Sequence, residues 1–263
     1  MKIVPIHCLT DNYAYLLICR QTGHCAVVDP SEAAPVIKVL TEQQKKQDLQ
    51  LVAILNTHHH WDHVGGNEEL KSQFPDIKIY AHASDKGRIA GQTEFLEHGD
   101  RLQIGNLEGS IVHNPGHTSG AISYAFGDAL FTGDTLFGGG CGRVFEGTPS
   151  QMYHSLNQVI GSFADETKIY FGHEYTVNNL RFAMSVETDN PDIRQRAQRA
   201  VGQRGTGKAT SPSTLGEERL TNPFLRCDHI NVIESLRRHD PGLGANPEPA
   251  EVFRVLRSWK DRF

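Results

Sequence analysis

The sequence lacks the paired cysteines that a disulfide framework or a thiolate zinc site requires. The chain has an odd number of cysteines, and no two of them form a C-x-x-C pair. The five positions are Cys8, Cys19, Cys25, Cys141 and Cys227. Unpaired cysteines are typical of a reducing compartment, so we expect a cytoplasmic protein.

Long apolar runs and an excess of basic residues are also missing. No stretch approaches the roughly 20 apolar residues of a membrane-spanning helix, so we expect no membrane insertion. The N-terminus has one lysine and only a short apolar run before Asp11, which does not fit a secretory signal peptide. The net charge of −5 argues against nucleic-acid binding, which needs a basic surface.

The 263 residues are enough for one large domain or for a domain with an appendage. Residues 1–173 alternate short strands with a few helices, which are predicted over 32–46, 65–73 and 149–161. Strands are predicted over 2–6, 13–19, 24–28, 51–56, 77–80, 101–104, 109–113, 121–126, 129–132 and 168–171. These patterns predict an α/β domain over 1–173.

After His173 the pattern becomes helical, without strands between the helices. Helices are predicted over 175–187, 192–202, 228–238 and 248–260. Residues 203–222 are rich in Gly, Ser, Thr and Pro and are predicted to form a long loop. We therefore expect a helical domain over 174–263.

Histidine is abundant, with 14 residues, and the most informative segment is T-H-H-H-W-D-H at 57–63. It follows an apolar run at 51–55 that is typical of a buried strand. Its ligand-type residues, with H-x-H-x-D-H spacing, are His58, His60, Asp62 and His63. Because so short a segment cannot wrap a single ion, these residues indicate two metals side by side, an arrangement typical of hydrolases.

Three further predicted strands each end just before a ligand-type residue that follows a glycine. These residues are His117, Asp134 and His173. Ligands at the carboxyl ends of neighbouring strands converge on one edge of a sheet. A single such residue is more often a surface or core residue, and Asp134 alone could be a turn residue. Together with the first motif, the three favour a dinuclear metal site.

Four motifs in this order, THHHWDH (57–63), PGHTSG (115–120), FTGDTLF (131–137) and FGHEYT (171–176), resemble the metallo-β-lactamase superfamily. The resemblance is close to its glyoxalase II branch, the hydroxyacylglutathione hydrolases, and covers almost the whole chain. It implies a four-layer αββα sandwich with a C-terminal helical domain that binds glutathione. It also implies a first metal held by His58, His60 and His117, a second held by Asp62, His63 and His173, and a bridging Asp134.

The resemblance also assigns supporting and substrate-binding residues. Asp29 is similar to the acidic residue that braces the histidine-rich loop, although it could instead cap the helix predicted over 32–46. His59 alternates with the ligands and is expected to point away from the metals, where it would either pack in the core or support the ligands. The residues implied to bind glutathione are Arg143, Tyr175, Arg257 and Lys260. A tyrosine often found two residues after Arg143 in this family is Phe145 here, so that hydroxyl contact is lost.

The glycine-rich segment 138–142 is expected to bring backbone amides and Arg143 near the substrate, unless it is only a tight turn. Cys141 is expected to be a packed residue and not a nucleophile. The arginines of 194–204 are interpreted as a solvated helix face. The metal is expected to be zinc, with iron and manganese as alternatives.

The activity implied is hydrolysis of S-2-hydroxyacylglutathione thioesters, converting S-D-lactoylglutathione to glutathione and D-lactate, the second step of methylglyoxal detoxification. The nucleophile would be a metal-bridging hydroxide held by Asp134, with no side-chain base. We expect a monomer. The alternatives are a single-iron persulfide dioxygenase, a β-lactamase or RNA-processing nuclease of the superfamily, and a non-catalytic protein with structural zinc. Metal stoichiometry, oxygen uptake and activity separate them.

Overall fold

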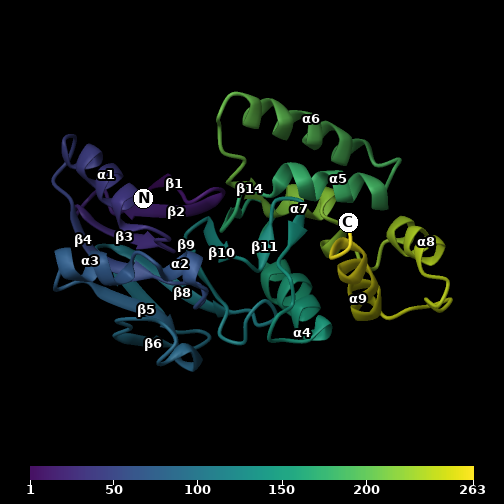
Figure 1. Cartoon of the computed structure of the whole chain (residues 1–263), viewed down its shortest axis with the longest axis horizontal. Helices are drawn as coiled ribbons and strands as arrows, with labels where there is room; N and C mark the ends of the chain where they lie inside the picture. Colours follow the sequence, from purple (N-terminus) through teal and green to yellow (C-terminus); the bar gives the residue numbers. More distant parts are fainter. The chain divides into compact units, whose positions relative to one another are not determined.

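The computed structural model describes all residues, 1–263, and the chain forms two compact units. The first unit comprises Met1–His113 and Gly120–Gly133, and the second comprises Asn114–Ser119 and Asp134–Phe263. Figure 1 shows their elements coloured along the sequence. Each unit has its own cluster of buried apolar side chains.

The first sheet of the first unit is mixed, in the order β1-β2-β3-β4-β5-β6. Its antiparallel strands are β1 (Lys2–Cys8), β2 (Asn12–Ile18) and β3 (His24–Val28), and β3 runs parallel to β4 (Gln50–Leu55), β5 (Lys78–His82) and β6 (Glu94–Leu96). Helices α1 (Ala33–Gln44) and α3 (Asn67–Gln73) contribute Val36, Leu40 and Leu70 to the core cluster of this sheet. Parallel strands place their carboxyl ends at one edge, where the loops after β3, β4 and β5 begin.

A second set of strands in the first unit is antiparallel: β7 (Arg101–Ile104), β8 (Leu107–His113), β9 (Ile122–Phe126) and β10 (Ala129–Gly133). It packs on the first sheet, because the Tyr124 hydroxyl donates to the carbonyls of Asn56 and Tyr80 and the rings of Tyr15 and Phe131 lie 5.6 Å apart. β2, β9 and β10 are buried along their whole length, as strands inside a sandwich must be. The first unit thus contains a helix layer and two facing sheets.

The second unit is mainly helical. Its strands form two short pairs, β11 (Leu136–Phe137) with β12 (Gly140–Cys141) and β13 (Lys168–Phe171) with β14 (Ser213–Thr214). Its helices are α4 (Pro149–His154), α5 (Thr176–Val186), α6 (Pro191–Gly205), α7 (Leu215–Thr221), α8 (Ile230–His239) and α9 (Pro249–Lys260). α5 and α6 lie side by side (Figure 1) and share a core of Leu180, Ala183, Ile193, Ala197 and Ala200.

Local sequence signals fix where several helices begin. Thr148 and Gln151 form a reciprocal capping box at the start of α4, and Asn190 accepts from the amides of Asp192 and Ile193 at the start of α6. Proline occupies a first-turn position in α4, α6 and α9. The remaining short helices are α2 (Trp61–Val64), η1 (Ala83–Asp85), η2 (Ser155–Val159), η3 (Ile160–Ser162) and η4 (Pro223–Leu225).

The ten strands and the main helices expected from the sequence are present within a few residues. The long loop predicted over 203–222 is wrong, because α6 runs to Gly205, β14 covers Ser213–Thr214 and α7 covers Leu215–Thr221. The expectation of no strands after His173 is wrong for the same reason. The side chain of Thr214 accepts from the amide of Glu217 and starts α7, whose sequence LGEERLT has too few apolar residues for a visible period.

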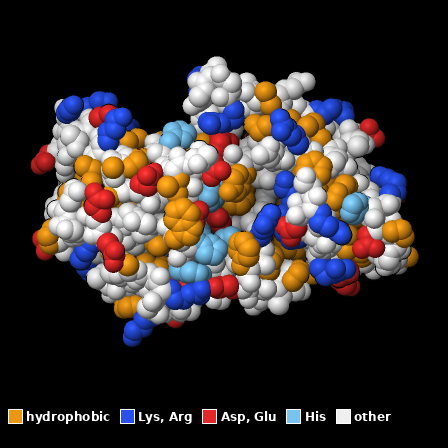
Figure 2. All heavy atoms as spheres, in the orientation of Figure 1, with side chains coloured by type: hydrophobic (Ala, Val, Ile, Leu, Met, Phe, Trp, Pro, Cys, Tyr) orange, Lys and Arg blue, Asp and Glu red, His pale blue; other side chains and the backbone are white.

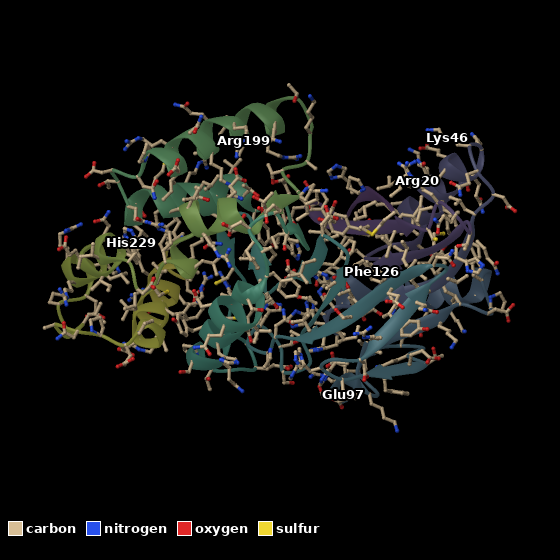
Figure 3. The ribbon with its side chains drawn as sticks, turned by 180° about the vertical axis from the view of Figure 1, so that it is seen from behind. Arg20, Lys46, Glu97, Phe126, Arg199 and His229 are labelled. Carbon is tan, nitrogen blue, oxygen red and sulfur yellow. The ribbon has the colours of Figure 1, made fainter.

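The arginines of α6 form the expected solvated face only in part, since Arg194 and Arg199 are exposed and Arg196 is buried. The side chain of Arg196 is buried and donates to Glu218 and Thr221, while the exposed Arg199, labelled in Figure 3, pairs with Glu217. α6 is therefore tied to α7 through charged side chains. Figure 2 shows basic and acidic side chains mixed over one face of the molecule, not gathered by sign. No helix is both long and apolar enough for a transmembrane span.

Candidate functional site

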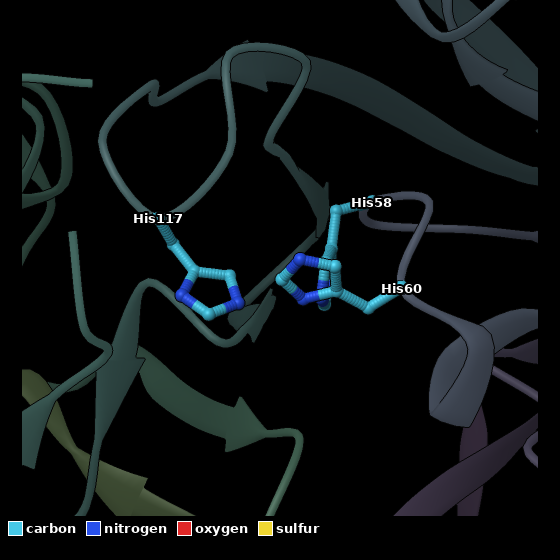
Figure 4. A group of neighbouring side chains, drawn as sticks. All are labelled: His58, His60 and His117. Atoms are coloured by element: carbon cyan, nitrogen blue, oxygen red, sulfur yellow. The ribbon is translucent and has the colours of Figure 1, made fainter. Parts of the chain in front are cut away.

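The histidine-rich loop of the first unit, residues 57–63, follows the end of β4 and runs into α2, at the carboxyl edge of the parallel strands. The rings of His58 and His60 meet edge to face at 80° (Figure 4), with Nε2 of His58 3.1 Å from Nδ1 of His60. Two imidazole nitrogens that bind one zinc ion tetrahedrally lie about 3.3 Å apart, given a Zn–N distance of about 2.0–2.1 Å. The observed spacing is therefore that of two ligands to one ion.

Asp29, at the end of β3, fixes this loop from inside the first unit. Its carboxylate accepts from the amide and hydroxyl of Thr57, both at 2.7 Å, and lies 3.1 Å from Nδ1 of His63. Asp29 is buried with φ +47°, a left-handed conformation that is strained for a non-glycine residue. It does not cap α1, whose N-cap residue is Glu32.

The remaining ligand-type residue of this loop, Asp62, lies close to His63. Oδ2 of Asp62 is 3.7 Å from Nε2 of His63 and accepts from Asn12 Nδ2 at 3.0 Å. The two atoms are spaced as ligands that share an ion would be. With Nδ1 of His63 directed at Asp29, Nε2 is the nitrogen that the loop offers to a metal.

The second unit holds the other three predicted ligands together. Oδ2 of Asp134 lies 3.6 Å from Nε2 of His117 and 3.3 Å from Nε2 of His173. Nδ1 of His117, whose ring is also drawn in Figure 4, is 2.8 Å from the carbonyl of Arg143. The ring must carry its proton on Nδ1 to donate there, which leaves an unprotonated Nε2 that could bind a metal.

Glycines permit close backbone approaches on both sides of these ligands. At Gly133 (φ +48°), which precedes Asp134, a Cβ would lie 2.2 Å from Oγ1 of Thr57. At Gly142 a Cβ would lie 2.0 Å from the carbonyl oxygen of Asp134 and 3.0 Å from Nδ1 of His117. A larger residue at either position would displace the ligand-bearing segment.

The donor set fits a pair of divalent ions such as zinc. Imidazole and carboxylate are ligands that zinc, iron and manganese all accept. His58, His63 and His117 each direct one ring nitrogen at an oxygen of the protein, of Thr57, Asp29 and Arg143 respectively. Such hydrogen bonds fix the tautomer and orientation of metal-binding histidines.

A cavity of about 470 Å³ in the second unit collects the residues expected to bind the substrate. Arg143, Tyr175, Arg257 and Lys260 all line it, together with His117 and Asp134. The ring of Tyr175 stacks on His173 with 4.7 Å between centroids. Phe145 is exposed, and its ring lies 5.3 Å from that of His117.

The two C-terminal cations differ in environment. Arg257 is buried, donates to the carbonyl of Cys141 at 2.9 Å, and directs Nε and Nη2 at Asp261 at 3.1 and 3.0 Å. Nζ of Lys260 lies over the ring of Phe182 at 5.1 Å from its centroid. Partial burial lowers the pKa of Lys260 to about 8, and the nearby Arg257 charge acts in the same direction.

The glycine-rich segment 138–142 is held by hydrogen bonds to residues of α7 and the residue that follows it. The amide of Gly139 donates to Glu218 at 2.8 Å, and Asn222 donates to the carbonyl of Gly140 at 2.9 Å. The Gly139 amide is therefore engaged by Glu218, contrary to the expectation that these amides face the substrate. Burial raises the pKa of Cys141 to about 11, so its thiol stays protonated at neutral pH, as expected of a packed residue.

Sequence reasoning missed Asp261, Asn179 and Glu218. Asp261 lines the cavity beside the two cations, and its position directly after Lys260 was a visible signal. Asn179 also lines the cavity and donates to the carbonyl of Gly138 at 3.2 Å. Nothing in the sequence separates Glu218 from its exposed neighbours, because its role depends on packing.

Two family models together match residues 10–263 of the chain. The family described as "Metallo-beta-lactamase superfamily" matches residues 10–173, and "Hydroxyacylglutathione hydrolase C-terminus" matches 174–263. A protein of Thermosynechococcus vestitus named hydroxyacylglutathione hydrolase is 48% identical over 266 residues, covering 100% of both chains.

Among solved structures, ETHE1 from Myxococcus xanthus superposes with a TM-score of 0.66 at 24% identity, covering 99% of this chain and 98% of its own. A protein designated TTHA1623, solved in a di-iron-bound form, superposes with a TM-score of 0.58 at 25% identity, covering 86% of this chain and 100% of its own. The family match over residues 10–173 and the likeness to ETHE1 together confirm the metallo-β-lactamase fold with its C-terminal helical region. The chain therefore belongs to the hydroxyacylglutathione hydrolase family of the metallo-β-lactamase superfamily.

Proposed function

We propose that this protein hydrolyses S-2-hydroxyacylglutathione thioesters, with S-D-lactoylglutathione as substrate and glutathione and D-lactate as products. The observation that carries the proposal is the cavity of the second unit, where the four substrate residues expected from the resemblance lie with the two ligand-type residues His117 and Asp134. Full-length relatives at 48% identity named for this activity support it.

We further propose that seven side chains hold two divalent ions, with zinc as the expected metal. The first ion would be held by His58, His60 and His117 and the second by Asp62, His63 and His173, with Asp134 bridging. When bound, such a pair lowers the pKa of a bound water toward about 7 and polarises the substrate carbonyl. Asp29 would keep the loop of the first unit in place through Thr57 and His63.

The protein's own residues would bind and orient the thioester. Arg143, Arg257 and Lys260 supply positive charge for the carboxylates of glutathione, and Tyr175 supplies a hydroxyl. Anchoring the remote end of the substrate converts binding energy into orientation of the reacting carbonyl. The departing thiolate is stable, with a thiol pKa of about 8.5, so no side chain needs to protonate it.

The test is hydrolysis of S-D-lactoylglutathione in water enriched in oxygen-18, with thiol release and the mass of the acid measured together. The proposal predicts stoichiometric thiol and one labelled oxygen in the lactate. Absence of thiol release, with consumption of oxygen on glutathione persulfide and one iron per chain, would establish the dioxygenase instead.

We also propose a cytoplasmic monomer that acts on a small-molecule thioester without nucleic acid or a membrane. All five cysteines are buried free thiols, which suits a reducing compartment. Sedimentation of the purified protein tests the monomer, and a dimer that persists on dilution would contradict it.

A further inference from the structure

His59 stands between two proposed metal ligands in the sequence, yet its side chain points to a separate group of charged residues in the first unit. Its Nδ1 lies 3.2 Å from Oδ1 of Asp85, and its Nε2 lies 2.6 Å from Nη2 of Arg88. Nη1 of Arg88 also approaches Asp85 Oδ1, at 3.5 Å. Both ring nitrogens of His59 are thus engaged by side chains that are not ligands.

The chemistry of these partners fixes the protonation of His59. A guanidinium has only donors, so Nε2 of His59 must accept and carry no proton. The ring proton then sits on Nδ1, which faces the carboxylate of Asp85 at 3.2 Å in an electrostatic contact. Arg88 therefore selects one tautomer of His59, and Asp85 holds the ring in one orientation.

Asp85 is itself held rigidly. Its side chain is fully buried, and a Cβ on Gly120 would lie 2.6–2.7 Å from its carboxylate atoms, so only glycine fits there. Asp85 is the last residue of η1. At the start of this turn, the amide of Ser84 donates to Nδ1 of His82 at 3.2 Å. A buried carboxylate costs several kcal/mol unless nearby polar or charged groups offset it, and Arg88 at 3.5 Å and His59 at 3.2 Å are such groups.

The histidine-rich loop is consequently fixed at two places. Asp29, at the end of β3, binds Thr57 and His63, and Asp85, just after β5, binds His59. β4, which carries the loop, lies between these two strands in the sheet. Without the second contact, the backbone between His58 and His60 would be anchored at one side only.

We propose that Arg88, His59 and Asp85 form a positioning relay that presents His58 and His60 to their metal ion. This inference rests on the proposed metal site, but it concerns residues that bind neither metal nor substrate. It predicts that breaking the relay weakens metal binding more than it alters the substrate affinity of the metal-loaded protein. Changes to metal-supporting residues typically cost 10–100-fold in affinity.

The test compares Asp85→Asn, His59→Gln and the double variant with the wild type. Metal dissociation constants are measured by competition with a chelator, and the visible spectrum of the cobalt-substituted proteins reports the ligand geometry. Each single variant should lose about 10–100-fold in metal affinity and show an altered cobalt spectrum. Because the residues act as one unit, the double variant should lose little more metal affinity than the single variant that binds metal less tightly.

The exposed end of the relay offers variants that should leave the fold intact. Arg88→Met should weaken metal binding and Arg88→Lys should restore part of it, because lysine keeps one donor for Nε2 of His59. Arg101→Met, at an exposed arginine of β7 in the same unit, should change nothing.

Unchanged metal affinity and cobalt spectrum in both single variants would overturn the relay, as would fully additive losses in the double variant. If the wild type binds two metals and hydrolyses the thioester, and the variants have the same metal affinity as the wild type, only this inference is contradicted. A wild-type protein with no metal affinity or no thioester hydrolysis would instead contradict the proposed function.

Discussion

Lys260 and Asp261 are adjacent in the sequence, line the same cavity and carry opposite charges. Lys260 is a cation held partly out of water against an aromatic ring, and Asp261 occupies the Nε and Nη2 donors of Arg257. An anionic substrate should be attracted by the charge of Lys260, and it should compete with Asp261 for the donors of Arg257. The two residues therefore give opposite predictions for substrate affinity.

Replacing Lys260 by methionine should raise KM for S-D-lactoylglutathione about tenfold, since a hydrogen bond to a charged group contributes about 1.5–3 kcal/mol. kcat should change less than twofold, because Lys260 is not proposed to touch the reacting atoms. Steady-state kinetics measure both constants. Lys208→Met, at a lysine outside the cavity, is the control, and equal KM values for the two variants would contradict the anchoring role.

Replacing Asp261 by asparagine should lower KM by about two- to fivefold, the range expected when an ion pair of up to about 1 kcal/mol no longer competes with the substrate. The side chain of Asp261 is 40% exposed and also lies 3.6 Å from Nε of Arg143, so its removal frees two cations. Competitive inhibition by S-alkylglutathione should tighten in parallel. A rise in KM would show that Asp261 orients Arg257 for the substrate.

Substrate affinity should also depend on pH through Lys260. Its pKa is lowered to about 8, so the cation is present below that pH and is lost as the pH rises through it. Arg143, Arg257, Asp261 and Cys141 are the charged and titratable groups around it. KM should therefore rise above about pH 8. In the Lys260→Arg variant, KM should not change with pH in this range. Identical pH profiles of KM for both proteins would exclude Lys260 as the titrating group.

At the scale of elements, α7 supports the β11–β12 hairpin that borders the cavity. The fully buried carboxylate of Glu218 accepts from Arg196, from Ser213 at 2.6 Å and from the Gly139 amide at 2.8 Å. α7 was hidden from sequence reasoning because its stability comes from these charged contacts and not from an apolar stripe. By contrast, α9 was predictable, since Val252, Val255 and Leu256 recur at helical spacing and are buried.

Glu218→Gln should destabilise the second unit by up to about 3–5 kcal/mol, because it removes the fully buried carboxylate from Arg196 and leaves only the partly exposed Glu217, 3.1 Å from Nε. Urea unfolding followed by far-UV circular dichroism measures the loss. Glu217→Gln on the same helix removes the 29% exposed carboxylate that also contacts Arg196 and Arg199, and it should cost less, about 1 kcal/mol. Equal losses for the two variants would contradict the support that Glu218 gives to α7 and the hairpin.

At the scale of the whole molecule, the sequence predicted most of the fold because its strands and helices carry clear periodicity. It predicted the ligand types from the spacing of 57–63 and from the glycines before His117, Asp134 and His173. It did not reveal the contacts that orient those ligands, such as Asp85 with His59 or the Arg143 carbonyl with His117. These contacts join residues far apart in the sequence, where no local pattern marks them.

The central claim is thioester hydrolysis that depends on two metal ions. Its most direct test is to strip the protein with a chelator, return zinc in known amounts, and measure S-D-lactoylglutathione hydrolysis against metal bound per chain. Activity should be absent in the stripped protein and should be complete only at about two ions per chain, as in two-metal sites. Full activity with one ion, or activity that survives complete removal of metal, would contradict the account.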